Sequence, residues 1–489
     1  MVQTSLDCQA PLVPPSSRGW LRCWLAEAGA QLRLALPFAT GQLINCAATF
    51  VTLHVVGGEG TGAVAAVGLA MALYACLGRN LIMGLCGAVD TISSQAAGAG
   101  RLDLLGPIFR RSCLFLLLHL GPFTLLCVSA LWWLPLVTEP SIGHVTAKFL
   151  LLVIPDLAAQ CIWRPMNRVL ASQRITSPFM FVSLLALVCH YLFCLSLVSR
   201  FGALGAAVAT SLSGWMTLFF GTASVWLVGA GPTIWGGQST DEAIKQGGAG
   251  WLDLSKLAYP SAAMRILESS GFSGIVTTSS LLPFPKIEVD IMSLSLNVYG
   301  CLFTPFPALS VCADTRVGNA IGRGAAMEAQ RAMRVAAVLS IPSAAAVSLV
   351  LVVPQCRQLV DTVLHLDMLD ARVKAGLDTI FTIFVCGFYY VDGFQTALSG
   401  AIRGTGQQQR GARICVLAYW VAGIPAALAL GFAAGLKSTG LWLGMMVGPF
   451  VQMVLYSWLL VKLDWHAVAA TCEERLRPMD EVDDSATGA

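Results

Sequence analysis

Two acidic residues stand far inside stretches of sequence that are otherwise apolar. Glu268 lies in the stretch 257–282, and Asp392 lies in the stretch 376–400. If both stretches are helices, a rise of about 1.5 Å per residue places Glu268 roughly 16 Å and Asp392 roughly 24 Å from one helix end. An ionisable group buried that deeply in an apolar medium is costly, so it indicates a functional site.

The chemistry that such carboxyl groups offer is reversible protonation. Burial disfavours the charged form of a carboxyl group and a nearby cation favours it, so the surroundings decide whether the group holds a proton. A carboxylate in a cavity that opens alternately to two sides can load a proton on one side and release it on the other. We therefore expect Glu268 and Asp392 to couple proton movement. The alternative for Glu268 is a structural pair with Arg265, three residues earlier on one helical face.

Other polar residues also interrupt apolar stretches and could line a cavity between helices. Arg79 lies in the middle of one such stretch. It is either a buried cation held by a carboxylate or by helix carbonyls, or a contact for an anionic group of a substrate. The full set expected at a substrate cavity is Gln42, Asn45, Arg79, Arg265, Asn297, Tyr299 and Gln395, with Gln160 as a further polar candidate.

The composition indicates that these residues lie in a membrane. Of the 489 residues, 56% are hydrophobic and 12% are charged, and the mean hydropathy is +0.72. A typical soluble domain has about 25% charged residues. The net charge of +3 and the absence of a basic tract argue against a nucleic-acid partner. Most of the 16 cysteines lie within apolar runs and show no metal-ligand spacing, so we expect no metal and no cofactor.

Twelve apolar stretches are long enough to cross a bilayer, which predicts an all-α membrane protein with 12 transmembrane helices. Asp156 and Gln160 interrupt the fourth stretch, which is the weakest. The predicted spans are 34–56, 63–89, 113–137, 147–163, 178–198, 201–228, 257–282, 291–312, 333–353, 376–400, 412–435 and 439–461.

The distribution of Lys and Arg between the loops predicts the orientation. With the N-terminus in the cytoplasm, 21 of the 30 Lys and Arg residues fall on the cytoplasmic side and 7 on the other. Twelve crossings then place the C-terminus in the cytoplasm as well. The sequence leaves open whether the membrane is the plasma membrane or a vacuolar or other organellar membrane.

The chain contains an internal repeat. "DTISSQAAGAG" begins at Asp90, and "DTRVGNAIGRG" begins at Asp314, 224 positions later. Arg168 and Arg403 are also equivalent, 235 positions apart. Six helices per half leave both halves in the same orientation, so the pseudo-two-fold axis should run along the membrane normal. Parallel repeats of this kind build transporters whose site lies between the repeats.

The repeat also predicts local structure and the division of the chain into parts. We expect Asp90 and Asp314 to cap the helical segments that follow them, and we expect the glycines of the two motif copies to let the chain turn. The repeat aligns Glu268 with the neutral Asn45, so the acidic residues should be confined to the second half. The expected parts are a cytoplasmic tail (1–30), an N-lobe (31–230), a cytoplasmic linker (231–255), a C-lobe (256–465) and a cytoplasmic acidic tail (466–489), which we expect to be disordered from Cys472 onward.

These landmarks resemble the multidrug and toxic compound extrusion (MATE) family, most closely its eukaryotic branch. The resemblance runs from about residue 34 to 465 and rests on the order of several motifs. They are "GLCGAVDTISSQAAGAG", "RPMNRVLASQ", "YPSAAMRILESSGF", "ADTRVGNAIGRG", "QTALSGAIRGTGQQQRGA" and "GLWLG".

The resemblance implies a V-shaped pair of six-helix lobes that export organic, often cationic compounds in exchange for protons or sodium. It places the family's acidic residues of helices 7 and 10 on Glu268 and Asp392. The chain differs from plant-like members at Ser269 and Ser270, where they carry aromatic residues. It also differs at Arg79 and Arg265, where they carry apolar ones.

The sequence therefore predicts a monomeric, multi-pass antiporter that exports small organic solutes in exchange for protons by alternating access. A sodium-coupled exporter and a lipid-linked oligosaccharide flippase of related fold are the alternatives. No GxxxxGK[ST], HExxH or GxSxG motif is present, which argues against an ATP-driven pump and against a membrane-embedded enzyme. A channel or a receptor fits the internal duplication less well.

The position of Arg79 can be tested by chemical labelling. A lipid-facing arginine at this depth would be costly, so residue 79 should face an aqueous cavity. With the native cysteines removed, Arg79→Cys is expected to react with a water-soluble thiol reagent. Protection of this cysteine in every conformational state would contradict the expectation.

Overall fold

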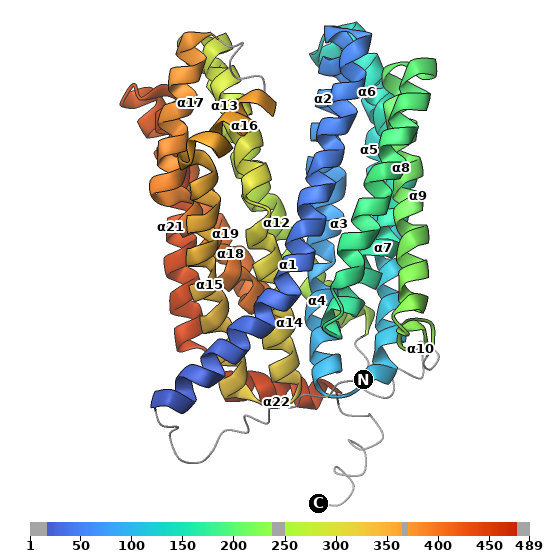
Figure 1. The fold of residues 1–489 in the computed structure, drawn as a ribbon, viewed down its shortest axis with the longest axis vertical. Coiled ribbons are helices and arrows are strands. Elements are labelled where there is room, and N and C mark those ends of the chain that lie inside the picture. The colour runs from blue at the N-terminus through green and yellow to red at the C-terminus, as the bar shows by residue number, and fades with distance from the viewer. Residues whose placement is uncertain (1–16, 237–249, 364–369, 477–489) are drawn as a thin grey trace, which may run out of the picture.

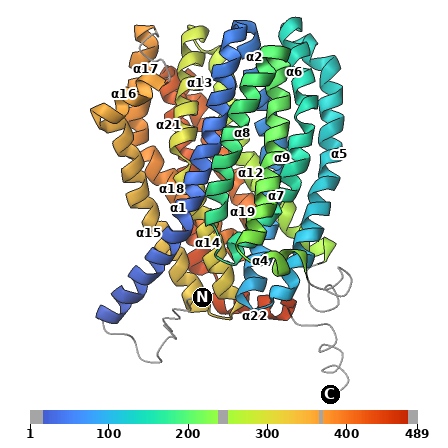
Figure 2. The ribbon, with the colours of Figure 1, turned by 45° about the vertical axis from the view of Figure 1, so that its right-hand side comes forward.

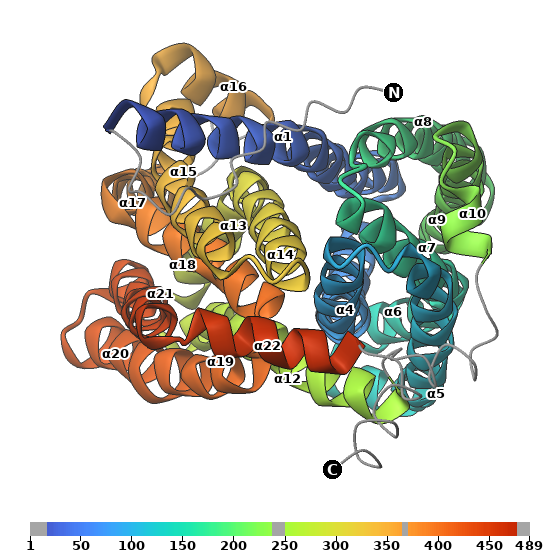
Figure 3. The same ribbon diagram turned by 90° about the horizontal axis from the view of Figure 1, so that it is seen from below.

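The structure, a computed structural model, describes residues 17–236, 250–363 and 370–476. Within these ranges all regular structure is helical and no strand occurs. The helices form two bundles that lie side by side and draw together at the end of the molecule where α22 lies (Figure 1). The same division is seen along the long axis of the molecule (Figure 3). The expected all-α architecture with two lobes is confirmed.

The first bundle is built from the N-terminal half of the chain. Its helices are α1 (Ser17–Val56), α2 (Thr61–Leu73), α3 (Asn80–Leu85), α4 (Gly87–Gly98), α5 (Leu105–Val137), α6 (Pro140–Leu152), α7 (Ile154–Ser172), α8 (Ser177–Phe201), α9 (Ala203–Leu227) and α10 (Gly231–Trp235). A π-helical segment, Tyr74–Arg79, joins α2 to α3.

The second bundle follows in the C-terminal half. Its helices are α12 (Trp251–Thr278), α13 (Pro285–Leu302), α14 (Pro305–Gly322), α15 (Ala326–Val352), α16 (Pro354–Val363), α17 (Ala371–Ile383), α18 (Tyr389–Gly404), α19 (Gln408–Cys415), α20 (Ile424–Leu428), α21 (Lys437–Lys462) and α22 (Trp465–Leu476). π-Helical segments precede α18 (Phe384–Phe388) and flank α20 (Val416–Gly423 and Ala429–Ala433).

These helices account for eleven of the twelve predicted membrane spans by length and apolar composition, and α12 covers the twelfth by length. In the described part of the chain, ten helices are long and apolar enough to cross a membrane, and the pair α13–α14, bent by 44°, gives an eleventh. The remaining stretch is α12, whose 28 residues extend about 42 Å, more than the roughly 30 Å of a hydrocarbon core. It carries Arg265 and Glu268, which explains its lower hydropathy.

The ends of the chain are more helical than the sequence indicated. α1 begins at Ser17, within the predicted tail; its first turns project from the bundles (Figure 2), and the turns around Glu27 and Gln31 contact the second bundle. There Arg316 donates two hydrogen bonds to Glu27, and Gln31 Nε2 donates to the carbonyl oxygen of Ala332 at 2.8 Å. The expectation of disorder from Cys472 onward is wrong for residues 472–476, because α22 continues to Leu476. Residues 477–489 and most of the predicted linker (237–249) lie outside the described residues.

The repeated motif does not cap helices as expected. Asp90 and Asp314 lie inside α4 and α14 rather than at their first residues, because each helix begins before its motif. The expected turns are confirmed. Gly100 and Gly324, at the ends of the two motifs, adopt φ angles of +77° and +72°. This left-handed region is accessible to glycine at little cost.

The two copies of the motif pack against each other, with reciprocal contacts that follow the repeat. A Cβ atom on Gly98 would lie 2.2 Å from the carbonyl oxygen of Asn319, and one on Gly322 would lie 2.0 Å from that of Gln95. Gln95 and Asn319 occupy the same place in the two copies. On Gly318, a Cβ would lie 1.9 Å from the Ser94 hydroxyl. The glycines therefore allow α4 and α14 to approach as closely as their backbones permit.

Polar contacts join the bundles at the same place. Gln95 Nε2 donates to the carbonyl oxygen of Gly404 at 3.1 Å, and Asn319 Nδ2 donates to that of Ser172 at 3.2 Å. Thr91 Oγ1 donates to the carbonyl oxygen of Arg403 at 2.8 Å. We refer to this contact of α4 with α14, together with these hydrogen bonds, as the α4–α14 seal.

A larger side chain at Gly98 should open the α4–α14 seal. Gly98→Val would place atoms on the carbonyl oxygen of Asn319, so the two helices must separate. In a cysteine-free background, Gln95→Cys should be protected from a water-soluble maleimide and should become reactive when Gly98→Val is added. Gly121→Val is the control, since nothing lies within 4 Å of a Cβ there. Equal protection with and without Gly98→Val would contradict this packing.

Candidate functional site

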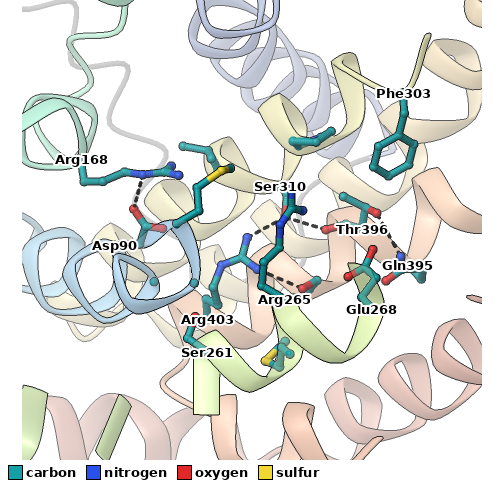
Figure 4. Close-up of a pocket in the computed structure, with 17 residues that line it drawn as sticks. Asp90, Arg168, Ser261, Arg265, Glu268, Phe303, Ser310, Gln395, Thr396 and Arg403 are labelled. Atoms are coloured by element: carbon teal, nitrogen blue, oxygen red, sulfur yellow. Dashed lines mark hydrogen bonds and ion pairs between the residues drawn. The ribbon is translucent and has the colours of Figure 1, made fainter. Parts of the chain in front are cut away.

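A cavity of about 80 Å³ lies between the two bundles, immediately above the α4–α14 seal. Residues of α3, α4, α7, α12, α14 and α18 line it, so both halves of the chain contribute (Figure 4). Its charged lining residues are Asp90, Arg168, Arg265, Glu268 and Arg403. Serines and a threonine of α12, α14 and α18 add further polar groups to its wall.

Two ion pairs hold the base of this cavity. Arg168 Nε lies 3.2 Å from Asp90 Oδ1, with both side chains 9% exposed. Arg403 Nε lies 3.3 Å from Asp314 Oδ2, and its guanidinium also donates to Ser310 Oγ at 2.8 Å. The two pairs are equivalent in the internal repeat. The aspartates of the repeated motif therefore bind the repeated arginines and position them beside the cavity.

Glu268 faces the same cavity from α12. Arg265, Arg403 and Gln395 line the cavity together with it. Among the described residues, no ion pair within 4.0 Å joins Arg265 to Glu268. Arg265 Nε is buried without a hydrogen-bond partner. The structural pair considered as the alternative is therefore not formed in this conformation.

Asp392 lies behind Gln395 and is fully buried on α18. The Tyr299 hydroxyl donates a hydrogen bond to Asp392 Oδ2. Gln395 Nε2 donates a hydrogen bond to Asp392 Oδ1 at 2.6 Å. Gln395 therefore lines the same cavity as Glu268 and is bonded to Asp392 behind the cavity wall. Aromatic rings surround Tyr299, with Phe388 at 5.3 Å and Trp442 at 5.7 Å between ring centroids. The packing fixes the tyrosine and keeps water away from Asp392.

The other residues expected at a cavity have different positions. Arg265 and Gln395 line the cavity described here. Tyr299 is 5% exposed and contributes through its bond to Asp392. Four residues of the expected set lie outside this cavity: Gln42, Asn45, Arg79 and Asn297. The Gln42 side chain is half-buried, and the other three residues are exposed.

A buried acidic residue also lies in the first bundle. Asp156 on α7 is 5% exposed, and the Tyr74 hydroxyl donates a hydrogen bond to its carboxylate. Gln160 Nε2 donates to Asp156 Oδ1 at 3.3 Å. The sequence analysis treated Asp156 only as an interruption of an apolar stretch. A signal was present, because Asp156 precedes Asp392 by 236 positions, close to the spacing of Arg168 and Arg403.

The described residues include no group of three or more His, Cys, Asp or Glu side chains that could hold a metal ion. The site therefore consists of carboxylates, guanidinium groups, hydroxyls and amides. These groups can bind a polar solute and can exchange protons.

Comparison with known proteins identifies the family. The MatE family model matches residues 37–196 and 260–428, which together cover about two thirds of the chain and fall once in each bundle. The chain belongs to the MatE family. It is a multi-pass membrane transporter of the multidrug and toxic compound extrusion type, and not an enzyme. The expected resemblance is confirmed.

Curated relatives extend the match over nearly the whole chain. Protein DETOXIFICATION 17 of Arabidopsis thaliana is 29% identical over 460 residues, which cover 94% of each chain. Protein DETOXIFICATION 14 of the same plant is 28% identical over 434 residues, covering 87% of this chain and 86% of the relative.

Solved structures agree with the MatE assignment. The eukaryotic MATE transporter AtDTX14 superposes with a TM-score of 0.84 at 26% identity, covering 93% of this chain and 99% of that one. A multidrug resistance MATE transporter in an outward-facing conformation has a TM-score of 0.75 at 17% identity, covering 92% and 97% of the two chains. This second likeness concerns the fold alone.

The buried ion pairs predict a large and local effect on stability. Arg168→Met should leave Asp90 buried without its cation, and such a loss typically costs about 3–5 kcal/mol. The thermal unfolding midpoint of the detergent-solubilised protein should fall markedly. Arg323→Met is the matched control, because its pair with Glu328 is 37% and 39% exposed and such pairs contribute about 0–1 kcal/mol. Equal midpoints for the two variants would contradict the structural role of Arg168.

Proposed function

We propose that this MatE transporter exports small organic solutes from the cytoplasm in exchange for protons, by alternating access. The observation that carries the proposal is the arrangement of Glu268, Gln395 and Asp392. Glu268 lines the cavity between the lobes together with Gln395, and Gln395 donates a hydrogen bond to the fully buried carboxyl group of Asp392. A solute in the cavity can therefore influence the proton carried by these groups.

The hydrogen-bond partners of Asp392 favour a proton over a sodium ion as the coupling ion. Both of its oxygens accept hydrogen bonds from neutral donors, the Tyr299 hydroxyl and the Gln395 amide. Such donors stabilise the ionised form, while burial favours the protonated form. The carboxyl group is thus able to exchange a proton without dissolving an ion pair.

The charge of the cavity bears on the solutes that it accepts. Three arginines and two acidic residues line it, and Arg265 has a buried nitrogen without a partner. A solute that combines a hydrogen-bond acceptor with an apolar body would satisfy this nitrogen. Exposed Arg79 lies outside the cavity, 5.9 Å from the Tyr74 ring centroid, where it could meet a solute on entry.

The orientation follows from the Lys and Arg distribution, with both termini in the cytoplasm. In this orientation the α4–α14 seal closes the cytoplasmic side, and the conformation described here faces the opposite side. The printed names of the relatives, which refer to detoxification, support an export role. We propose that the transporter acts as a monomer, with the lobes divided at the 231–255 linker.

A flux assay tests the proposal directly. The purified protein is placed in sealed vesicles with an imposed proton or sodium gradient. A panel of organic cations, carboxylates and neutral glycosides is then followed by mass spectrometry. Uphill movement of at least one compound driven by the proton gradient is expected. Movement driven only by sodium, or no movement in either gradient, would contradict the proposal.

Glu268→Gln should separate a coupling role from a packing role. The amide keeps the shape of the side chain but cannot ionise, so the variant should fold and yet lose uphill export driven by a proton gradient. Asp392→Asn should lose the same activity. Glu139→Gln, at an exposed site, is the control and should export normally.

If Glu268 serves only to neutralise Arg265, a different pattern follows. Glu268→Gln would then leave a buried cation unpaired, and the protein would be poorly expressed. The double variant Arg265→Leu with Glu268→Gln would restore both expression and transport. Uphill export by this double variant would remove Glu268 from the coupling mechanism.

A further inference from the structure

The first bundle contains a buried carboxylate with the same set of partners as Asp392. Asp156 accepts from Tyr74 and from Gln160, while Asp392 accepts from Tyr299 and from Gln395. In each bundle the tyrosine donates to Oδ2 and the glutamine donates to Oδ1. The two arrangements are therefore the same in residue type and in the atoms that they join.

The internal repeat accounts for this equivalence. Tyr74 and Tyr299 are 225 positions apart, close to the 224 positions that separate the two copies of the motif. Gln160 and Gln395 are 235 positions apart, as are Arg168 and Arg403. Each set thus occupies corresponding helices of the two bundles. The tyrosines, the glutamines and the two aspartates, which are 236 positions apart, all follow the spacing of the duplication to within one residue.

The surroundings of Asp156 are closed on several sides. From α9, Gly214 approaches so closely that a Cβ there would lie 1.9 Å from Asp156 Oδ1. The π-helical segment before α3 contributes Tyr74 and Arg79, and α7 itself contributes Gln160, Cys161 and Arg164. Arg164 Nε is buried and has no hydrogen-bond partner. The site therefore holds one carboxyl group near two guanidinium groups.

Neither guanidinium group binds the carboxylate directly. In the described part of the chain, Asp156 forms no ion pair within 4.0 Å, whereas Asp90 is bound by Arg168 at 3.2 Å. The direct partners of Asp156 are the neutral donors of Tyr74 and Gln160. Protonation of Asp156 thus breaks no ion pair, but it removes the negative charge that offsets Arg79 and Arg164. The N-lobe gains one positive charge when the proton is bound.

We propose that Asp156 is a second proton-binding site, which binds and releases a proton during the transport cycle as Asp392 does in the C-lobe. The step is simple protonation of a carboxylate to a carboxylic acid, and the proton comes from water on the side to which the lobes are open. This second site goes beyond the export mechanism proposed above, in which only Glu268 and Asp392 carry protons. Each lobe would then carry its own proton, and the charge change would act on the solute from both sides.

The test measures protonation directly and needs no transported compound. Infrared difference spectra between acidic and neutral pH are recorded on the purified full-length protein in lipid. The wild type should show a protonated-carboxyl band at acidic pH that contains a contribution from Asp156. Asp156→Asn should lose that contribution, and Asp392→Asn should keep it while losing its own. A band in Asp156→Asn identical to that of the wild type would overturn the proposal.

A second pair of variants keeps the test valid if Asp156→Asn does not fold. Tyr74→Phe removes a donor that stabilises ionised Asp156 but leaves the carboxyl group in place. The Asp156 contribution should then appear at a higher pH than in the wild type, while the Asp392 contribution stays unchanged. Tyr299→Phe is the matched control and should shift the Asp392 contribution instead. A carboxyl band that does not respond to Tyr74→Phe would also overturn the proposal.

The result is independent of the export mechanism. Loss of the Asp156 band establishes this site whether or not Glu268→Gln abolishes transport. Failure of Glu268→Gln to affect export would refute the coupling role of Glu268 and leave the infrared result for Asp156 in place.

Discussion

The close approach of α4 and α14 is the contact on which the rest of the structure depends. Gly98, Gly318 and Gly322 remove the side chains that would hold these helices apart. The two bundles can then share hydrogen bonds at one end of the molecule while the central cavity remains above them. Because the contact is made by the two copies of one motif, each lobe supplies an equivalent surface. Separation along such a surface lets the lobes move as units.

Charges in the interior fall into two classes that differ in their partners. Asp90 and Asp314 are held by arginines, and removal of either partner is costly, so these residues are structural. Asp156 and Asp392 accept from neutral donors, and Glu268 stands at the cavity wall with Gln395 beside it. A carboxylate bound by neutral donors can change its protonation state without the loss of an ion pair. The same residue type therefore serves a structural purpose in one place and is available for proton exchange in another.

The sequence was sufficient to predict the helices and the duplication, because apolar length and repeated motifs are local properties of the chain. It also singled out Glu268 and Asp392 by their depth in apolar stretches. It could not pair Asp90 with Arg168 or Tyr74 with Asp156, which lie far apart in the chain and meet only after folding. The expected helix caps at Asp90 and Asp314 were wrong because apolar residues before each motif extend the helices. The spacing of the repeat could have indicated Asp156, since it relates both Arg168 to Arg403 and Gln160 to Gln395.

Exchange of solute for protons by alternating access, as proposed above, requires that protonation of the interior carboxyl groups alters the closure of the α4–α14 seal. Spin labels at the exposed residues Leu102 and Met327, one on each side of the seal, allow distances to be measured by double electron–electron resonance. The account predicts two distance populations whose ratio changes with pH in the wild type. The ratio should become insensitive to pH when Glu268→Gln, Asp392→Asn and Asp156→Asn are combined, because no proton-binding carboxyl group proposed here then remains. A pH-dependent ratio that survives in this triple variant would contradict the account.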